Sequence, residues 1–216
     1  MRNIIRSVSI VGVVVGLAAV AQAAAPSPAP AATQGAFQKD LVGVVSYTEK
    51  HILELEDAFP QNKYNWRPGP GVRSVAETFL HIAFANYGIT KMVTGKEPPA
   101  DAAWEMNPAK WEKKTTDKAE IKKILEQSFA FAKQAASTFP DADLDKQVNF
   151  FGHEMSARAV LIILAGHVNE HLGQEVAYAR TNKIVPPWSK DEHMPTDKKS
   201  ASDEKPAEKK AVAAKP

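Results

Sequence analysis

Apolar residues recur every three or four positions in four long segments, the spacing that places them on one face of an α-helix. These segments cover about residues 37–59, 74–92, 117–139 and 156–180. The first segment shows the pattern in full, and its expected inward stripe consists of Leu41, Val44, Thr48, Ile52, Leu55 and Phe59. No segment alternates convincingly between apolar and polar residues, and only Lys146–Phe151 suggests a short extended piece. The pattern therefore predicts an all-α protein.

Capping residues and prolines mark where these helices begin and end. Ser74, followed three residues later by Glu77, has the sequence of a capping box at the start of the second helix. Asp117 opens the third helix, and Pro140 ends it. Four helices of this length predict a four-helix bundle. The connection over residues 93–116 is longer than adjacent antiparallel helices need, so we expect it to cross an end of the bundle and leave the second and third helices parallel.

Both ends of the chain differ in composition from the helical segments. Residues 1–23 have the features of a secretory signal peptide, with Arg2 and Arg6 before an apolar run and Ala21-Gln22-Ala23 as a cleavage site. An Ala/Pro-rich linker is expected over residues 24–36, a single bundle domain over 37–189 and a disordered charged tail over 190–216. We therefore expect a periplasmic or secreted protein with no stable membrane anchor after signal cleavage. The alternative is a signal segment that is retained as an anchor.

The composition excludes several kinds of site. The chain contains no cysteine, so it has no disulfide, no thiolate metal ligand and no thiol nucleophile. Removing Arg2 and Arg6 with the signal leaves 25 basic and 25 acidic residues, so the mature chain is formally neutral. This balance lacks the positive charge that nucleic-acid binding requires, and we expect no nucleic-acid partner.

Three histidines are candidates for a metal site. His167 and His171 lie four residues apart in the fourth helical segment and so face the same side, while His81 lies within the second segment. Two imidazoles one turn apart can bind one ion, and a third from another helix leaves an open coordination position for chemistry. A buried ring without such a partner loses about 1–3 kcal/mol for each unpaired polar group. The alternative is that these are ordinary core or surface histidines whose ring nitrogens are hydrogen-bonded.

Small residues near the histidines add to this interpretation. Gly166 and Gly173 lie inside the fourth helix, where glycine costs about 1 kcal/mol relative to alanine. We interpret them as positions that another group approaches closely. In the second helix, Ala85 and Gly88 follow His81 by one and two turns and are expected to leave room for a ligand.

Several runs of residues resemble the DinB-like (YfiT-like) superfamily. They are Asn65-Trp66-Arg67-Pro68, the segment Ser74–His81, Phe151-Gly152 and the stretch His167–Pro187, and they extend over essentially the whole expected domain. The resemblance implies a four-helix bundle with up-down-down-up order, which agrees with the long second connection. It also implies a divalent-metal site of three histidines, which correspond here to His81, His167 and His171. Relatives include transferases that use low-molecular-weight thiols, but an exported protein meets fewer such thiols, which weakens a thiol-transfer reading.

Three further polar residues are candidates for catalytic or supporting roles. Glu77 could orient His81 or act as a general base, but it also completes the capping box of Ser74, and we favour that role. Gln174 lies on the metal-site face of the fourth helix, where its amide could bind a ligand or substrate. His51 falls on the inward stripe of the first helix and could approach the metal, although a hydrogen-bonded core histidine is the interpretation we favour.

The other histidines and the tryptophans carry weaker signals. His153 is expected in a loop, either as a proton shuttle or as a solvated side chain, and His193 lies in the expected tail. The tryptophans could line the mouth of a pocket or pack at the ends of the bundle, and they are Trp66, Trp104, Trp111 and Trp188.

We therefore expect an exported metal-dependent hydrolase or group transferase that acts on a small molecule. Three imidazoles suit zinc or nickel, with iron, cobalt or manganese as alternatives, whereas magnesium and calcium prefer oxygen ligands. Such an ion activates water or polarises a carbonyl, and Glu77, Gln174 or His51 would help to place the substrate. The alternative is a non-catalytic metal- or ligand-binding module that forms a homodimer through an apolar helix face. The inward stripe of the fourth helix carries no carboxylate that is an obvious general base, which argues against a strong hydrolase.

Overall fold

Four long helices form the bundle that the periodicity predicts. The computed structural model describes residues 35–189, so the expected signal peptide and tail, with His193, and nearly all of the expected linker lie outside the described residues. The long helices are α1 (Ala36–Ala58), α2 (Val75–Thr94), α4 (Lys118–Ser137) and α5 (Ala157–Thr181). They agree with the four periodic segments to within about two residues at each end. None of the described helices combines the length and apolar character needed to cross a membrane.

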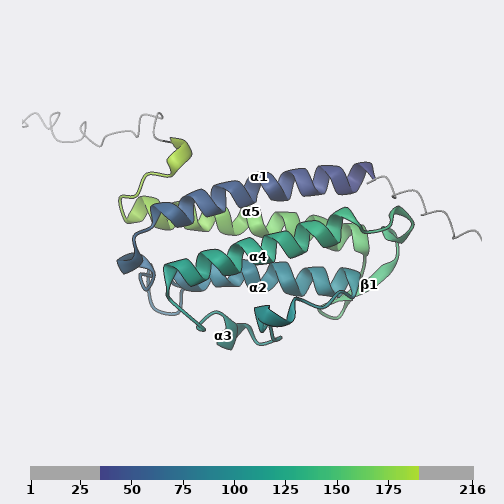
Figure 1. Ribbon diagram of the computed structural model, residues 1–216, viewed down its shortest axis with the longest axis horizontal. Helices are drawn as coiled ribbons and strands as arrows, with labels where there is room; N and C mark the ends of the chain where they lie inside the picture. Colours follow the sequence, from purple (N-terminus) through teal and green to yellow (C-terminus); the bar gives the residue numbers. More distant parts are fainter. Residues whose placement is uncertain (1–34, 190–216) are drawn as a thin grey trace, which may run out of the picture. The chain divides into compact units, whose positions relative to one another are not determined.

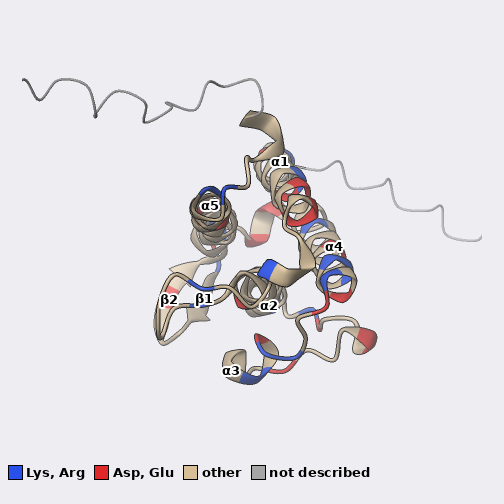
Figure 2. Cartoon of the chain, turned by 90° about the vertical axis from the view of Figure 1, so that its left-hand side faces the viewer, with Lys and Arg blue, Asp and Glu red and all other residues tan. Residues whose placement is uncertain are grey.

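The long helices occupy the corners of a square. Both α1 and α2 pack against α4 and α5, so α1 lies diagonally across from α2, as the end view in Figure 2 shows. The hydroxyl of Tyr178, near the end of α5, donates to the carbonyl of Arg73, just before α2, so these two helices are antiparallel. The histidines of α2 and α5 are thereby brought to one shared interface.

The second and third long helices run parallel, as the long connection predicts. The side chain of Lys96, just after α2, donates to Thr138, just after α4, so the two helices end side by side. In contrast, Gln38 at the start of α1 donates to the carbonyl of Phe139 beyond the end of α4, so α1 and α4 are antiparallel. The order is therefore up-down-down-up, and Figure 1 shows the four helices side by side.

Side-chain caps explain where the helices begin. The hydroxyl of Ser74 accepts from the backbone of Glu77, whose carboxylate accepts from the backbone of Ser74, so the predicted capping box is confirmed. The side chains of Asp117 and Ser156 cap α4 and α5 by accepting a hydrogen bond from the backbone three residues further on, without the reciprocal bond of a capping box. At the end of α2, Gly95 has a φ of 67°, a left-handed conformation that glycine adopts without steric cost.

The buried stripe of α1 differs from the prediction at one position. Leu41, Thr48, Ile52, Leu55 and Phe59 are buried as expected, but Val44 is 48% exposed and Val45 takes its place in the core. Both valines fit an apolar stripe in sequence. Only the packing of α1 against α4 and α5 decides which one is covered.

The segment between α2 and α4 follows the flank of α2 and contains a short helix, α3 (Pro108–Trp111), which Figure 1 shows below α2. The indole of Trp111 is buried and donates to the carbonyl of Leu80 in α2. A β-hairpin precedes α5, with β1 (Gln147–Phe150) antiparallel to β2 (His153–Ser156). The predicted extended piece corresponds to β1, whereas β2 was not predicted.

Candidate metal centre

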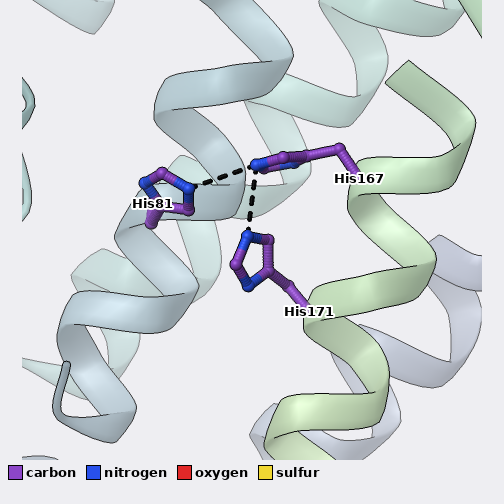
Figure 3. Close-up of side chains that lie close together, drawn as sticks. All are labelled: His81, His167 and His171. Carbon is purple, nitrogen blue, oxygen red and sulfur yellow. Dashed lines mark hydrogen bonds between the residues drawn. The ribbon is translucent and has the colours of Figure 1, made fainter. Parts of the chain in front are cut away.

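The three predicted histidines meet between α2 and α5 (Figure 3). The Nε2 atom of His167 lies 3.1 Å from that of His81 and 3.2 Å from that of His171. One ligand atom from each ring lies within 4.8 Å of the others, so the cluster could hold a single ion. The i, i+4 spacing in α5 produces one pair, and the antiparallel packing of α2 brings the third ring.

The distances between the nitrogens fit a tetrahedral metal site. Two imidazole nitrogens that each lie about 2.0–2.1 Å from zinc at a tetrahedral angle are separated by about 3.3–3.4 Å. The measured separations of 3.1 and 3.2 Å are close to this value. Two of the three pairs of rings are therefore spaced as the ligands of one ion would be, and the third pair lies within 4.8 Å.

The outer nitrogen of His81 is held by a carboxylate. Its Nδ1 atom lies 2.7 Å from Oε1 of Glu112, to which it donates a hydrogen bond, so the Nε2 lone pair faces the centre of the cluster. Arg73 in turn binds both oxygens of Glu112, at 2.8 and 3.0 Å. Histidines that ligate metals commonly donate to a carboxylate in this way, which fixes the tautomer and makes the ligand more basic.

The outer nitrogen of His171 is held by an amide. Its Nδ1 atom lies 2.8 Å from Oε1 of Gln174, whose amide nitrogen donates to the hydroxyl of Tyr178 at 2.7 Å. That hydroxyl donates to the carbonyl of Arg73. Arg73 therefore supports two of the three rings, one through its guanidinium and one through its backbone. Nδ1 of His167 is buried and has no hydrogen-bond partner among the described residues.

Burial keeps two of the rings neutral. Burial, together with the neighbouring rings of His171 and His81 and the guanidinium of Arg73, lowers the pKa of His167 to about 3. Burial also lowers the pKa of His171, although the hydrogen bond to Gln174 opposes this. Burial alone would raise the pKa of Glu112, but the hydrogen bonds from His81 and Arg73 outweigh it and lower that pKa. At neutral pH the cluster thus combines the neutral imidazoles of His167 and His171 with the ionised carboxylate of Glu112, protonation states that suit a metal site.

An apolar cavity of about 200 Å³ adjoins the cluster and is bordered by His81 and His167. Ala85 and Gly88 of α2 lie in its wall, so the expectation that these small residues leave room beside His81 is confirmed. The tip of the hairpin closes another side with Phe151. The candidate ion would therefore be reached from an apolar space.

The glycines of α5 do not have the role that the sequence suggested. A Cβ atom added at Gly166 or Gly173 would meet nothing within 4 Å, and both residues are exposed. The expectation of a close approach at these positions was therefore wrong. Gly88 is different, because a Cβ there would lie 3.2 Å from the Trp104 ring.

Two of the three catalytic candidates have other partners. The carboxylate of Glu77 binds the backbone of Ser74 and the guanidinium of Arg67. The ring of His51 packs against Trp188 and Tyr47 and bonds the carbonyl of Tyr47. Neither residue belongs to the histidine cluster, whereas Gln174 supports it directly through His171.

The remaining candidates lie outside the cavity beside the cluster. His153 is exposed at the start of β2. The tryptophans, all within the described chain, are absent from the cavity lining and pack elsewhere: Trp66 on Tyr178, Trp104 on Phe84, Trp111 near Tyr87 and Trp188 on His51. Packing was one of the two roles predicted for them.

Two features near the site could not be read from helical spacing alone. Glu112 lies just after α3, outside every long helix, and reaches His81 only because the connecting segment folds back along α2. Glu175 is fully buried one turn beyond His171, and burial raises its pKa well above the ordinary value, although the neighbouring Thr78 hydroxyl opposes this. The i+4 relation to His171 was a signal for its inward position, but nothing in the sequence marked it as uncharged.

Comparison with known proteins gives one family. A model of the DinB superfamily matches residues 46–174. A crystal structure of a DinB-like protein from Bacillus cereus ATCC 10987 is similar, with a TM-score of 0.57 and 21% identity over 69% of this chain and 95% of that one. The DinB-like protein YjoA from Bacillus subtilis has a TM-score of 0.53 and 16% identity over 68% of this chain and 93% of its own. No protein of curated function matches the chain significantly.

Proposed function

The chain belongs to the DinB superfamily, and we propose that it is an exported protein that binds one divalent transition-metal ion through His81, His167 and His171 and uses it in hydrolysis or group transfer on a small molecule. The observation that carries the proposal is the convergence of three Nε2 atoms. For two of the rings, the opposite nitrogen is already bonded to Glu112 or Gln174.

The donor set supports zinc or nickel, with iron, cobalt or manganese as alternatives. Imidazole nitrogen is the only ligand atom type in the cluster, since the chain has no cysteine and the carboxylate of Glu112 is already bound to His81 and Arg73. Oxygen-preferring magnesium and calcium do not suit such a set. An ion bound here supplies Lewis acidity, which activates water or polarises a carbonyl or phosphoryl oxygen.

In this proposal the protein's own residues orient the metal ligands and do not transfer protons. Glu112 and Gln174 keep the Nε2 lone pairs of His81 and His171 directed at the centre of the cluster. Arg73 holds Glu112 through its guanidinium and accepts from Tyr178, the partner of Gln174, through its backbone carbonyl. The cavity beside the rings presents apolar side chains to one side of the site. Glu77 and His51 stay candidates for catalysis only if they leave their present partners.

Export is proposed from composition alone. Arg2, Arg6 and the sequence Ala21-Gln22-Ala23 have the pattern of a cleaved signal peptide and support a periplasmic or secreted location. Mass spectrometry of the protein recovered from outside the cytoplasm should give an N-terminus at residue 24. Recovery of the intact chain from the cytoplasm would contradict this part of the proposal.

A non-catalytic metal- or ligand-binding module is the second candidate. It is favoured by the cavity lining, which contains no acidic or basic side chain other than the two histidines. Such a module would pair as a homodimer, for which exposed Val44 and Tyr47 of α1 and Ile162 of α5 supply apolar surface. Sedimentation analysis of the purified protein would decide the oligomeric state.

Turnover separates the two candidates. A panel of ester, amide and group-transfer substrates should reveal an activity that chelation removes, that zinc or nickel restores and that His167→Ala abolishes without unfolding the bundle. His153→Ala is the matched control, because that histidine is exposed in the hairpin. Activity that survives both chelation and His167→Ala would refute the metal mechanism.

A further inference from the structure

The cavity beside the histidines has the character of a site for the apolar part of a ligand. Besides His81 and His167, its lining consists of aliphatic, aromatic and methionine side chains and one glycine, drawn from α2, α5, the hairpin and the segment after α2. A polar or charged group placed there would lose water without gaining a partner, which is unfavourable. The cavity therefore selects against charged substituents.

The size of the cavity limits what it can hold. An apolar cavity of about 150 Å³ in another protein binds benzene, whereas sites for drug-sized ligands have about 300–1,000 Å³. The present cavity of about 200 Å³ has room for one aromatic ring or a short branched chain. It is bordered by His81 and His167, so a ligand held there lies beside the metal ligands.

The turn of the hairpin places an aromatic residue in an unfavourable backbone conformation beside this cavity. Phe151 has a φ of 52° and Gly152 a φ of 88°, so both central residues of the turn are left-handed. Asparagine and glycine are the usual residues of such a turn, and phenylalanine is disfavoured in this conformation. Phe151 is nevertheless 67% exposed, lines the cavity and contacts the ring of Phe150. A strained, exposed aromatic residue at the entrance of a cavity points to ligand contact rather than to folding.

We propose that this cavity binds the apolar portion, one ring or a short branched chain, of a neutral small-molecule substrate whose metal-binding group faces His81 and His167, with Phe151 closing over it. This inference rests on the proposed metal-dependent function, because it places the reacting group of the substrate beside the candidate ion.

The test compares two hydroxamic acids, which share a metal-binding group and differ in the size of their apolar part. Zinc-loaded protein should bind benzohydroxamic acid at least about tenfold more tightly than acetohydroxamic acid, because only the phenyl group fills the cavity. Ile163→Gln, which places an amide in the cavity wall, should bring the two affinities close together. Ile162→Gln is the matched control, because Ile162 is next to Ile163 in sequence but is 55% exposed and lies outside the cavity lining.

Phe151→Asn gives a readout that a structural role would not produce. Asparagine suits the left-handed turn, so the variant should melt at a higher temperature than the wild type while losing most of the preference for benzohydroxamic acid. Loss of stability with unchanged preference would show that Phe151 serves the fold and would overturn its assignment to the ligand.

A metal-free arm separates failure of the cavity from failure of the metal site. Saturation-transfer NMR with benzyl alcohol and metal-free protein should show binding in the wild type and in Ile162→Gln, but not in Ile163→Gln. If zinc is not retained, the proposed function fails while this result still supports the cavity. Equal hydroxamate affinities in zinc-loaded protein, or benzyl alcohol that does not bind, would overturn the substrate class.

Discussion

Replacing Glu112 by glutamine tests whether the residues behind the histidines control metal binding. Glu112→Gln keeps an oxygen that can accept from Nδ1 of His81 but removes the charge that Arg73 also binds. The side chain is only 10% exposed, so solvent screens this charge weakly. A hydrogen bond to a charged group contributes about 1.5–3 kcal/mol and a neutral one about 0.5–1.5 kcal/mol. The difference, about 1–1.5 kcal/mol, corresponds to a loss of roughly tenfold in metal affinity.

Competition against a zinc chelator of known affinity measures this loss. The matched control is Glu97→Gln, which removes the carboxylate of an exposed ion pair with Lys91 and should leave the affinity unchanged. The pKa of Glu112 is held below its ordinary value of 4.5, so its charge is present above that pH and is lost only as pH falls through the lowered pKa. The difference between Glu112→Gln and the wild type should therefore stay constant between about pH 6 and 8. Equal zinc affinities in the wild type and in a well-folded Glu112→Gln variant would show that the charge of Glu112 does not strengthen metal binding.

Three further predictions concern stability. Zinc should raise the melting temperature of the wild type, and His171→Ala should abolish both binding and this increase, which calorimetry with zinc and with chelator would show. The pKa of Glu175 is raised in the folded protein, so at a pH above the ordinary pKa of 4.5 this side chain loses its proton when the protein unfolds. The contribution of Glu175 to stability is therefore present below pH 4.5 and is lost as pH rises through the raised pKa of the folded state. Glu175→Met should accordingly raise the free energy of unfolding at pH 8 by about 1–3 kcal/mol, and urea titrations that show destabilisation there would contradict this. Gly166→Ala and Gly173→Ala should each stabilise the protein by about 0.5–1 kcal/mol because both Cβ positions are open, and a marked loss in thermal melts would show that something does approach them.

The bundle could be predicted because its signals are local. Helical periodicity, the Ser74 capping box and Pro140 give the number and bounds of the long helices, and the length of the connection before α4 gives their order. The choice between Val44 and Val45 as the buried residue could not be predicted, because it depends on how α1 rotates against its neighbours. The strand β2 was missed because its four residues show no alternation of apolar and polar side chains.

The three histidines could likewise be predicted from the sequence, whereas the carboxylate that supports His81 could not. His167 and His171 are related by one helical turn, so their common face follows from sequence. His81 was a candidate because it lies inside a second apolar helix, and the resemblance to the DinB family assigns it to the same site. Glu112 contacts His81 across 31 residues of chain, so no spacing rule could find it. The prediction that another group approaches Gly166 closely was wrong because this residue, although inside a helix, faces solvent.

X-ray absorption spectroscopy of zinc-loaded, tag-free protein can show whether one ion binds to the three imidazoles. We expect one zinc per chain with about three histidine nitrogens at about 2.0–2.1 Å, and a loss of imidazole scattering in His81→Ala. A spectrum of zinc bound only to oxygen, or one that is unchanged in His81→Ala, would show that the three histidines do not form the metal site.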